Sequence, residues 1–418
     1  MLIFPLNKIF KFSIVSLAFL LLNGNLLSSE KIIFISRTNE TKFYHTLFNN
    51  IREKNFCLIS NQAGTGKYLF MPSYKKKLSY LHEMAANHNL LIYRILTPEH
   101  GLSGQSESTG IDTDLMLTGN IPIFPVYHKT IGELAVLFDG CMSILFDLPD
   151  AGIRPFTYRT ILTRTIQALG AMGKKIPLYL IDQPNPASIY DAMGPMVQES
   201  YFSYLGEEAI PFFPGYSYAE LARYYISRHH LSMDIRYIAM PHYTPGAHVL
   251  DYPMDPPSPS LPHKRALHCY WIGIFLEGTS IDYGKYSKDP FCLIGHPDID
   301  FSIQPPRISG IKWVNYVYKP FGGIYKDRLI RGYRMEIDDI KLVDPVKSSY
   351  KILEYFHKNY PDIKIFTYNP PVFIFDKITG SSSMRTFLEK GLSYEKWFKI
   401  ENSTITKFNR NMYNFRLY

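Results

Sequence analysis

Short apolar runs alternate with stretches of helical periodicity between residues 55 and 240, and this alternation limits the possible folds more than any other feature. The apolar runs occupy residues 55–60, 90–96, 143–146, 176–181 and 235–240. The stretches of helical character between them lie at residues 73–87, 131–138, 158–172 and 218–227. Strands that alternate with helices form βαβ units, whose strands are parallel. The sequence therefore predicts an α/β fold built on a mainly parallel sheet. Pro122 and Pro125 place the extended segment 121–126 at a sheet edge, because proline cannot donate to a ladder.

A proline-rich segment divides the chain. Five prolines fall between residues 253 and 262, and proline both fixes φ and blocks regular pairing. We therefore expect a first domain over residues 30–255 and a smaller α/β domain over residues 256–418. The second domain is predicted to contain strands at residues 271–279 and 332–337 and helices at residues 348–359 and around Trp397.

The first 29 residues have the composition of a signal peptide. Lys8 and Lys11 give a basic start, an apolar run follows at residues 12–22, and Ser28 and Ser29 are small residues suited to cleavage. The apolar run is shorter than the ~20 residues that a membrane span needs. We therefore expect an exported protein, periplasmic or secreted, with no stable membrane span after cleavage. An uncleaved membrane anchor is the alternative.

The overall composition is that of a globular protein. Hydrophobic residues make up 46% of the chain and charged residues 20%. The net charge of +8 becomes +6 without residues 1–29, because Lys8 and Lys11 are removed and no acid is. The remaining charges are dispersed and form no basic run with interleaved aromatics, so no nucleic-acid partner is expected.

The four cysteines match no zinc or Cys-x-x-Cys spacing, so no metal site is expected. An even number of cysteines in an exported chain permits disulfides. Cys57 and Cys141, however, lie in apolar, strand-like runs, where buried thiols are the expected state. The other two are Cys269 and Cys292.

The segment Thr97–Gly104 carries the first candidate for chemistry. Its proline ends the preceding apolar run, and its two glycines let the chain turn sharply. Glu99 and His100 are thereby held just past the carboxyl end of a strand. In open α/β sheets, this is the rim where ligands bind.

Carboxylates also follow two later apolar runs. Asp147 and Asp182 each come directly after such a run, and Asp150 and Arg154 follow shortly after Asp147. Because parallel strands end at the same edge of a sheet, we expect Glu99, Asp147 and Asp182 to meet in one polar cleft. The alternative is a set of structural helix caps, since Asp is a good N-cap residue.

The segment after residue 60 resembles a phosphate-binding loop but lacks two of its defining residues. Asn61 occupies the first glycine position, and Tyr68 stands where a Ser or Thr would bind Mg²⁺. No Gly-x-Gly-x-x-Gly follows the first strand either. A nucleotide-dependent enzyme is therefore disfavoured, and no cofactor is expected.

An ordered series of short motifs resembles the exo-acting β-N-acetylmuramidases, a glycoside hydrolase family. The matching segments are Asn61-Gln62-x-Gly64, Pro98-Glu99-His100-Gly101-x-x-Gly104, Phe146-Asp147-x-x-Asp150-x-Gly152-x-Arg154-x-x-Thr157-Tyr158, Asp182-x-Pro184-Asn185-Pro186, Gly194-Pro195, Glu220-Leu221-Ala222, Pro256-Pro257-Ser258-Pro259 and Phe275-Leu276-Glu277-Gly278-Thr279. The resemblance implies a Rossmann-like first domain, a smaller second domain and an active cleft between them. It also implies that the partner is a peptidoglycan-derived muramyl saccharide, from which terminal N-acetylmuramic acid is removed.

The resemblance further implies roles for individual residues. Hydrolysis of a glycoside needs a proton donor and a second group that attacks the anomeric carbon or activates water. Glu99 is the candidate for one role, and Asp147 or Asp150 for the other. Arg154 suits the lactyl carboxylate of muramic acid because a guanidinium pairs well with carboxylates; the alternative is that it bridges one of these aspartates inside the fold. The remaining candidates for substrate binding are His100, Tyr158, Asp182, Asn185, Glu277 and Asn61.

Several polar positions of the family are replaced in this chain. Pro214 stands in place of a His, Gln183 of an Arg, Ser260 and Ser280 of Asn, Phe156 of a Tyr, and Tyr283-Gly284-Lys285-Tyr286 of Glu-Gly-Arg-Gly. The expected activity is that of an exported, cofactor-free glycosidase acting on muramyl glycans. The alternative is a degenerate relative that binds envelope glycan without cleaving it.

Overall fold

The computed structural model describes residues 29–36, 40–64, 74–104, 121–246, 255–300, 302–369 and 371–418. The expected signal peptide lies outside these residues except for Ser29, and so does the second half of the segment that resembles a phosphate loop. Among the residues described, no helix is both long and apolar enough to cross a membrane.

The described part of the N-terminal domain is built on a seven-stranded sheet with the order β1-β9-β6-β5-β2-β3-β4. All six neighbouring pairs are parallel, so the predicted α/β fold is confirmed. The order reverses between β2 and β5, and open α/β sheets place their ligand crevice at such a point. The strands are β1 (Ser29–Phe34), β2 (Asn55–Ser60), β3 (Leu91–Thr97), β4 (Ile123–Pro125), β5 (Ile144–Asp147), β6 (Leu178–Ile181) and β9 (Asp234–Ala239).

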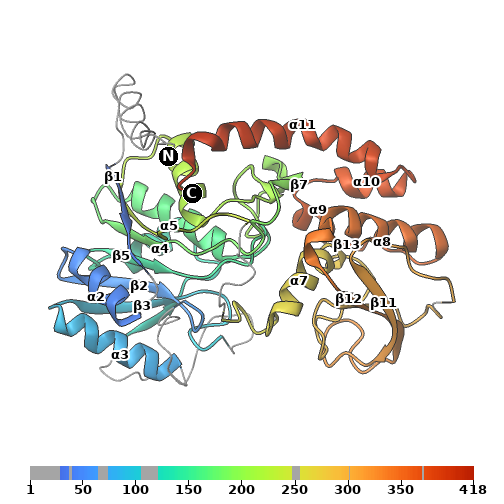
Figure 1. Ribbon diagram of the computed structural model, residues 1–418, viewed down its shortest axis with the longest axis horizontal. Coiled ribbons are helices and arrows are strands. Elements are labelled where there is room, and N and C mark those ends of the chain that lie inside the picture. The colour runs from blue at the N-terminus through green and yellow to red at the C-terminus, as the bar shows by residue number, and fades with distance from the viewer. Residues whose placement is uncertain are drawn as a thin grey trace, which may run out of the picture.

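Helices cover both faces of this sheet (Figure 1). Side chains alternate across a strand, so Phe56 and Leu58 of β2 pack on one side while Cys57 and Ile59 pack on the other. The first side is covered by α2 (Glu40–Asn50) and α3 (Tyr74–Asn87). The second side is covered by α4 (Ile131–Phe138), α5 (Tyr158–Ala171) and α6 (Tyr218–Arg228). Segment 121–126 supplies β4 at the edge of the sheet, as its prolines predict.

The C-terminal domain is smaller and has an antiparallel sheet with the order β10-β12-β11. Its strands are β10 (Leu293–Gly295), β11 (Ile311–Tyr318) and β12 (Ile330–Ile337). Its helices are α7 (Lys264–Gly273), α8 (Pro345–Asn359), α9 (Ile374–Thr379) and α10 (Ser383–Glu389). Two short hairpins complete the described sheets, β7 (Met193–Met196) with β8 (Pro211–Phe213) and β13 (Tyr368–Asn369) with β14 (Val372–Phe373).

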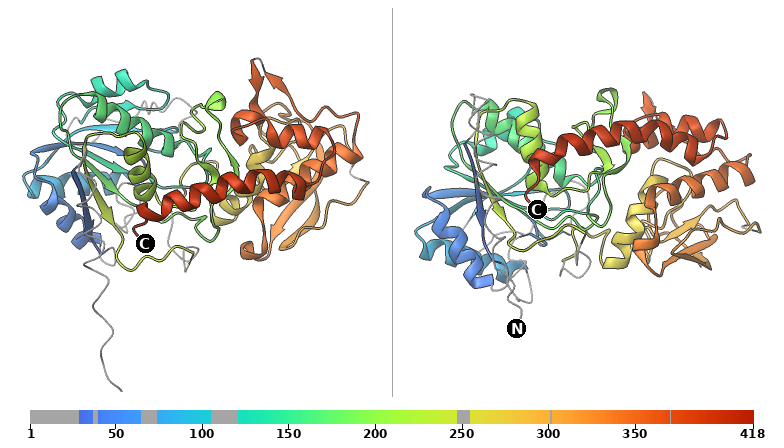
Figure 2. Two further views of the ribbon diagram at one scale, coloured as in Figure 1. Left: turned by 90° about the horizontal axis from the view of Figure 1, so that it is seen from above. Right: turned by 45° about the horizontal axis from the view of Figure 1, so that its top comes forward.

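The long helix α11 (Tyr394–Met412) connects the two domains. It leaves the C-terminal domain and returns the chain to the N-terminal domain, as both views in Figure 2 show. Its end packs Phe408 and Met412 against Tyr216 and Tyr224, which belong to the N-terminal domain. The last residue, Tyr418, donates a hydrogen bond from its hydroxyl to Asp182. The chain after α10 therefore belongs structurally to both domains.

The strand predicted at residues 271–279 is wrong. This segment forms the end of α7 and the 3₁₀ turn η3 (Ile274–Leu276). Residues 271–276 are buried on every side, and a continuous apolar run does not distinguish a buried strand from a buried helix. The helix start is set instead by His263, whose imidazole accepts a hydrogen bond from the backbone N–H of Ala266.

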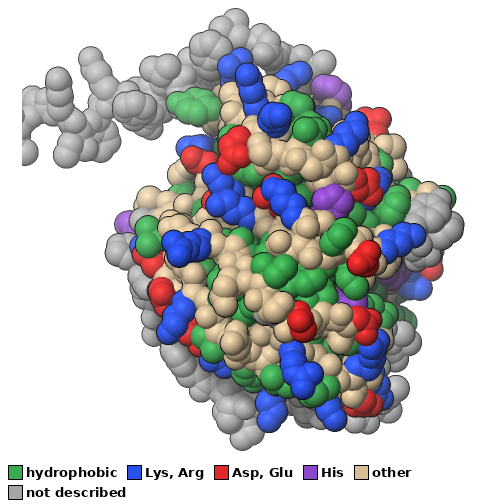
Figure 3. Space-filling model, turned by 90° about the vertical axis from the view of Figure 1, so that its right-hand side faces the viewer, with side chains coloured by type: hydrophobic (Ala, Val, Ile, Leu, Met, Phe, Trp, Pro, Cys, Tyr) green, Lys and Arg blue, Asp and Glu red, His purple; other side chains and the backbone are tan. Residues whose placement is uncertain are grey.

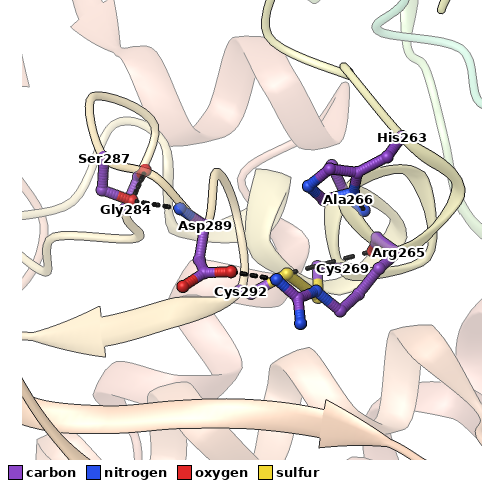
Figure 4. The surroundings of a disulfide bond; sticks show 8 residues. All are labelled: His263, Arg265, Ala266, Cys269, Gly284, Ser287, Asp289 and Cys292. Carbon is purple, nitrogen blue, oxygen red and sulfur yellow. Dashed lines mark hydrogen bonds and ion pairs between the residues drawn. A yellow bond between two sulfur atoms is a disulfide. The ribbon is translucent and has the colours of Figure 1, made fainter.

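The four cysteines form two disulfides, so the prediction of buried thiols at Cys57 and Cys141 is wrong in its chemistry although both are buried. Cys57 on β2 is paired in register with Ile144 on β5, and Cys141 lies just before β5. The two Cα atoms are 5.6 Å apart, within the range that a disulfide spans. The second bond ties Cys269 of α7 to Cys292, beside an ion pair between Arg265 and Asp289 (Figure 4).

Replacing Cys57 and Cys141 together by alanine is expected to lower the free energy of unfolding by about 2–4 kcal/mol, because the bond closes a long loop in the unfolded chain. The two residues are 84 positions apart, whereas Cys269 and Cys292 are 23 apart. The double alanine variant of the second pair is the matched control and should lose less. Urea unfolding followed by circular dichroism measures both. Equal stability of the wild type with and without reductant would contradict the bonding.

Candidate active site

A cavity of about 220 Å³ lies between the two domains and receives side chains from both. It opens at the carboxyl end of β3, beside the point where the strand order reverses. Aromatic walls and a small number of polar groups line it, which is the usual make-up of a small-molecule site. The polar and aromatic residues that the argument uses are Glu99, His100, Tyr127, Thr157 and Tyr158 from the N-terminal domain and Tyr270, Glu277, Lys285 and Phe291 from the C-terminal domain.

Glu99 is held in the cavity by hydroxyl groups. Thr157 donates a hydrogen bond of 3.0 Å from its hydroxyl to a carboxylate oxygen of Glu99. Thr157 is the N-cap residue of α5 but makes no side-chain cap to its own helix. Such a cap is worth about 1 kcal/mol, so the helix start gives up a local stabilising contact in order to hold Glu99. Because Thr157 is the N-cap residue, the carboxylate oxygen that it bonds lies near the N-terminus of α5, where a helix favours negative charge.

The backbone around Glu99 turns sharply. His100 has φ of 72° and Gly101 has φ of 73°, and Gly101 donates its N–H to the carbonyl of Pro98. Positive φ at a non-glycine residue is costly and concentrates at functional sites. The result is that Glu99 and His100 both line the cavity directly after the strand ends.

Tyr158 is buried behind Glu99 and links three segments. Its hydroxyl accepts a hydrogen bond of 2.9 Å from the Asn61 side chain and lies 3.1 Å from the carbonyl oxygen of Pro257 in the linker. It is also 3.4 Å from the backbone oxygen of Glu99. Burial, and then the charge of Glu99, raise the pKa of Tyr158, so the hydroxyl stays protonated. Asn61 therefore positions Tyr158 and does not itself line the cavity.

Glu277 enters the cavity from the C-terminal domain with a cation beside it. It follows η3, and the Lys285 ammonium lies 3.4 Å from one of its carboxylate oxygens. Burial opposes the charge on Lys285, but attraction, chiefly to Glu277, outweighs it and raises the pKa of Lys285. Gly278 follows with φ of 82°, and a Cβ there would lie 2.5 Å from the backbone nitrogen of Phe375. Only glycine therefore permits this close approach after Glu277.

Besides burial, the charges of Glu99 and Glu277 both raise the pKa values of Tyr127 and Tyr270. Burial, and then Glu99, raise the pKa of Tyr127, whose hydroxyl donates to that carboxylate; Glu277 adds a smaller effect. Burial also raises the pKa of Tyr270, and both Glu277 and Glu99 contribute. One electrostatic environment thus contains two acids from different domains, one cation and several neutral phenols.

The other carboxylates of the strand rim lie away from this cavity. Asp147 is buried and accepts a hydrogen bond of 3.0 Å from Gln183. Asp182 accepts from Ser217, from the backbone N–H of Ala219 and from Tyr418. These bonds fasten the start of α6 and the end of the chain. The expectation that Asp147 and Asp182 share one crevice with Glu99 is therefore not what the structure shows.

Asp150 and Asn185 are likewise engaged inside the fold. Asp150 accepts a 2.6 Å ion-paired hydrogen bond from Arg159, and both side chains are almost fully buried. It also accepts from the N–H of Gly152. Asn185 donates to the carbonyl of Tyr216 and accepts from the N–H of Ala187, which fixes the turn after β6. Neither residue lines the cavity.

Arg154 neither lines the cavity, where it could bind a substrate carboxylate, nor bridges Asp147 or Asp150, the two roles that the sequence suggested. Arg154 is 1% exposed, and its guanidinium donates to the backbone carbonyls of Pro195, Ile210 and Ile378. Its hydrogen-bond partners within the described part of the chain are these carbonyls and no carboxylate, and Asp150 pairs with Arg159 instead. Arg154 therefore connects the β7–β8 hairpin to α9 of the C-terminal domain instead of facing a substrate.

Sequence reasoning missed three groups that the structure brings to Glu99 and Glu277. They are Thr157, Tyr127 and Lys285. Thr157 is part of a motif that matches the family, and Lys285 is part of a segment in which family residues are replaced. The sequence could therefore have identified both as candidates. Tyr127 lies in no motif, and only its position just after the edge strand β4 relates it to the site.

Two carboxylates that face one cavity can perform acid–base or nucleophilic chemistry on a bound glycoside. Within the described residues, no group of three or more His, Cys, Asp or Glu side chains is arranged to hold a metal ion.

Family models and a characterised relative all match the chain to one family. The model of the N-terminal domain of exo-β-N-acetylmuramidase NamZ matches residues 56–265, and the model of its C-terminal domain matches residues 268–418. The peptidoglycan β-N-acetylmuramidase NamZ of Bacillus subtilis (strain 168) is 24% identical over 376 residues, covering 88% of each chain.

Two solved structures of DUF1343 family proteins from Bacteroides fragilis share the fold. One superposes with a TM-score of 0.74 at 20% identity, covering 89% of this chain and 96% of the other. The second has a TM-score of 0.68 at 22% identity, covering 90% and 98%.

Replacing Asp150 by asparagine is expected to destabilise the fold by about 3–5 kcal/mol, because it leaves the Arg159 guanidinium buried without a counter-charge. The thermal unfolding midpoint measures this loss. Asp139→Asn is the matched control, since Asp139 forms an exposed ion pair with Lys174 and its loss should leave the midpoint unchanged. An Asp150→Asn protein that unfolds like the wild type would contradict the structural role.

Proposed function

The chain belongs to the exo-β-N-acetylmuramidase NamZ family, and on that premise we propose that it is an exported glycoside hydrolase. Its substrate is a peptidoglycan fragment with a terminal β-linked N-acetylmuramic acid, which it releases. The observation that carries the proposal is that Glu99 and Glu277, which belong to different domains, line the same cavity. A pair of carboxylates around the scissile bond is what hydrolysis of a glycoside requires.

In this proposal, Glu99 protonates the glycosidic oxygen as the bond breaks. Thr157 and Tyr127 orient its carboxyl group through their hydroxyls. Glu277 is the second acid and faces the anomeric carbon, where positive charge develops in the transition state. Lys285 holds Glu277 in place at 3.4 Å. Glu277 thus replaces Asp147 and Asp150 as the candidate for the second role, since both aspartates are committed to internal partners.

Export rests on two independent features. The first 29 residues have a basic start, an apolar run and small residues suited to cleavage. All four cysteines are paired in two disulfides, and such bonds persist in the periplasm and outside the cell but are rare in a reducing cytosol.

The alternative function is glycan binding without cleavage. Three positions at which the chain departs from the family pattern, Phe156, Ser260 and Lys285, line the cavity itself. A fourth, Tyr283, is hydrogen-bonded to Glu277. Burial is the main cause that raises the pKa of Tyr283, and the charge of Glu277 raises it further. These replacements alter the groups that would touch a sugar while leaving Glu99 and its hydroxyl donors intact.

The Glu99→Gln variant is expected to lower kcat on a chromogenic β-N-acetylmuramide by about 10²–10⁴-fold, because a positioned acid contributes about that factor. The amide keeps the shape of the side chain but cannot transfer a proton. Glu354→Gln is the matched control, since Glu354 pairs with Lys358 on the exposed side of α8. Its turnover should equal that of the wild type.

Release of free N-acetylmuramic acid from defined peptidoglycan fragments identifies the reaction. Unchanged turnover in Glu99→Gln would remove Glu99 from the catalytic groups. Binding of muramyl ligands by the wild type with no product after long incubation would select the glycan-binding alternative.

A further inference from the structure

Two exposed aromatic rings continue the cavity outward from its Lys285 side. The Lys285 ammonium lines the cavity and lies 5.9 Å from the centre of the Tyr286 ring. The Phe321 ring centre is 6.0 Å further on and meets Tyr286 edge-on, with 82° between the ring planes. Tyr286 is 40% exposed and Phe321 is 65% exposed. The two rings therefore form a step on the surface, which is joined to the wall of the cavity through Lys285.

Backbone contacts hold this step in place. Phe321 donates its N–H to the carbonyl of Tyr286 at 2.9 Å. Gly322 and Gly323 pass under the Tyr286 ring, where an added Cβ would lie 2.7 and 3.0 Å from ring carbons. The turn after Phe321 is anchored to the Glu277 segment by Tyr325, whose hydroxyl donates to the carbonyl of Ser280 at 2.8 Å. Because these contacts already order the step in the free protein, it loses little conformational freedom when a ligand binds to it.

From this geometry, and resting on the proposed function, we propose that Tyr286 and Phe321 form a saccharide subsite outside the cavity. It holds the sugar on the leaving-group side of the scissile bond. The cavity, at about 220 Å³, falls below the ~300–1,000 Å³ of pockets that enclose drug-sized ligands. It therefore has room for the terminal sugar, and the rest of a glycan must leave through the opening.

The chemistry of the step suits a pyranose ring. The C–H faces of a pyranose are apolar and pack on aromatic rings, while the Tyr286 hydroxyl offers a polar edge to sugar hydroxyls. Lys319 and Lys326 are exposed on the same segment as Phe321. Grouped exposed apolar side chains bordered by polar residues are one of the features of ligand-binding grooves.

An anionic membrane is the other surface that exposed apolar and basic residues can meet, and the observations favour the saccharide. The basic residue Arg328 of the same loop is already paired with Asp298 at 2.8 Å. The end of the C-terminal domain seen in Figure 3 carries acidic and basic side chains interspersed, with no continuous field of one sign. Continuity with the cavity wall, in contrast, is specific to a ligand that occupies both places.

The test compares a short with a longer substrate. Methyl β-N-acetylmuramide has no ring in the leaving group, whereas a disaccharide of N-acetylmuramic acid β-linked to N-acetylglucosamine has one; release of N-acetylmuramic acid is measured for both. Tyr286→Ala with Phe321→Ala is expected to lower kcat/KM at least tenfold on the disaccharide and less than twofold on the methyl glycoside. Tyr413→Ala, which removes an exposed aromatic ring at the chain end, is the matched control and should change neither.

Each outcome decides the proposal. Equal changes on the two substrates, or none, would overturn the subsite. Binding to phosphatidylglycerol vesicles that the double variant loses, with its substrate preference unchanged, would assign the rings to a membrane and also overturn it. If the wild type cleaves neither substrate, the proposed function fails on its own. Calorimetric binding of the disaccharide then decides the subsite: weaker binding by the double variant supports it, and equal binding overturns it.

Discussion

The buried guanidinium of Arg154 ties the two domains together beside the cavity, and the cavity depends on the two domains staying in place. It donates to carbonyls on the β7–β8 hairpin of the N-terminal domain and to the carbonyl of Ile378 on α9 of the C-terminal domain. Ile378 itself lines the cavity. The Nε of Arg154 has no hydrogen-bond partner among the described residues, so loss of any of these carbonyls would leave a further donor of a buried ion unpaired, at a cost in free energy. Glu99 and Glu277 belong to different domains, and they can serve one substrate only while contacts such as this one, and the hydrogen bond from Trp271 to the carbonyl of Ala151, hold the domains together.

The sequence predicted the sheet well because its strands follow from local patterns. The apolar runs, the helical spacing between them and the edge prolines all correspond to elements of the N-terminal domain. The sequence also placed Asp147 and Asp182 correctly at strand ends. It did not predict what covers those ends. The partners of Asp182 are Ser217, Ala219 and Tyr418, and the last is 236 residues away, so no local pattern could reveal them.

The same limit explains the errors in the C-terminal domain and at the cysteines. A buried apolar run carries no period, so α7 could not be told from a strand. The disulfide between Cys57 and Cys141 depends on the register of β2 against β5, which fixes where Cys141 lies. Glu277 was placed near the cleft by family resemblance alone. Its ion pair with Lys285 and the bond from Thr157 to Glu99, which are 58 residues apart, depend on the folded arrangement of each domain and follow from no local pattern.

The central claim is that one sugar binds between the domains, touching Glu99 from one side and Glu277 from the other. A crystal structure of the Glu99→Gln protein soaked with a disaccharide of N-acetylmuramic acid β-linked to N-acetylglucosamine tests it most directly. The account predicts the muramic ring inside the cavity, with its glycosidic oxygen within hydrogen-bond distance of residue 99 and its anomeric carbon facing Glu277. A muramic ring bound at the Asp147 and Asp182 strand ends, with the cavity empty, would contradict it.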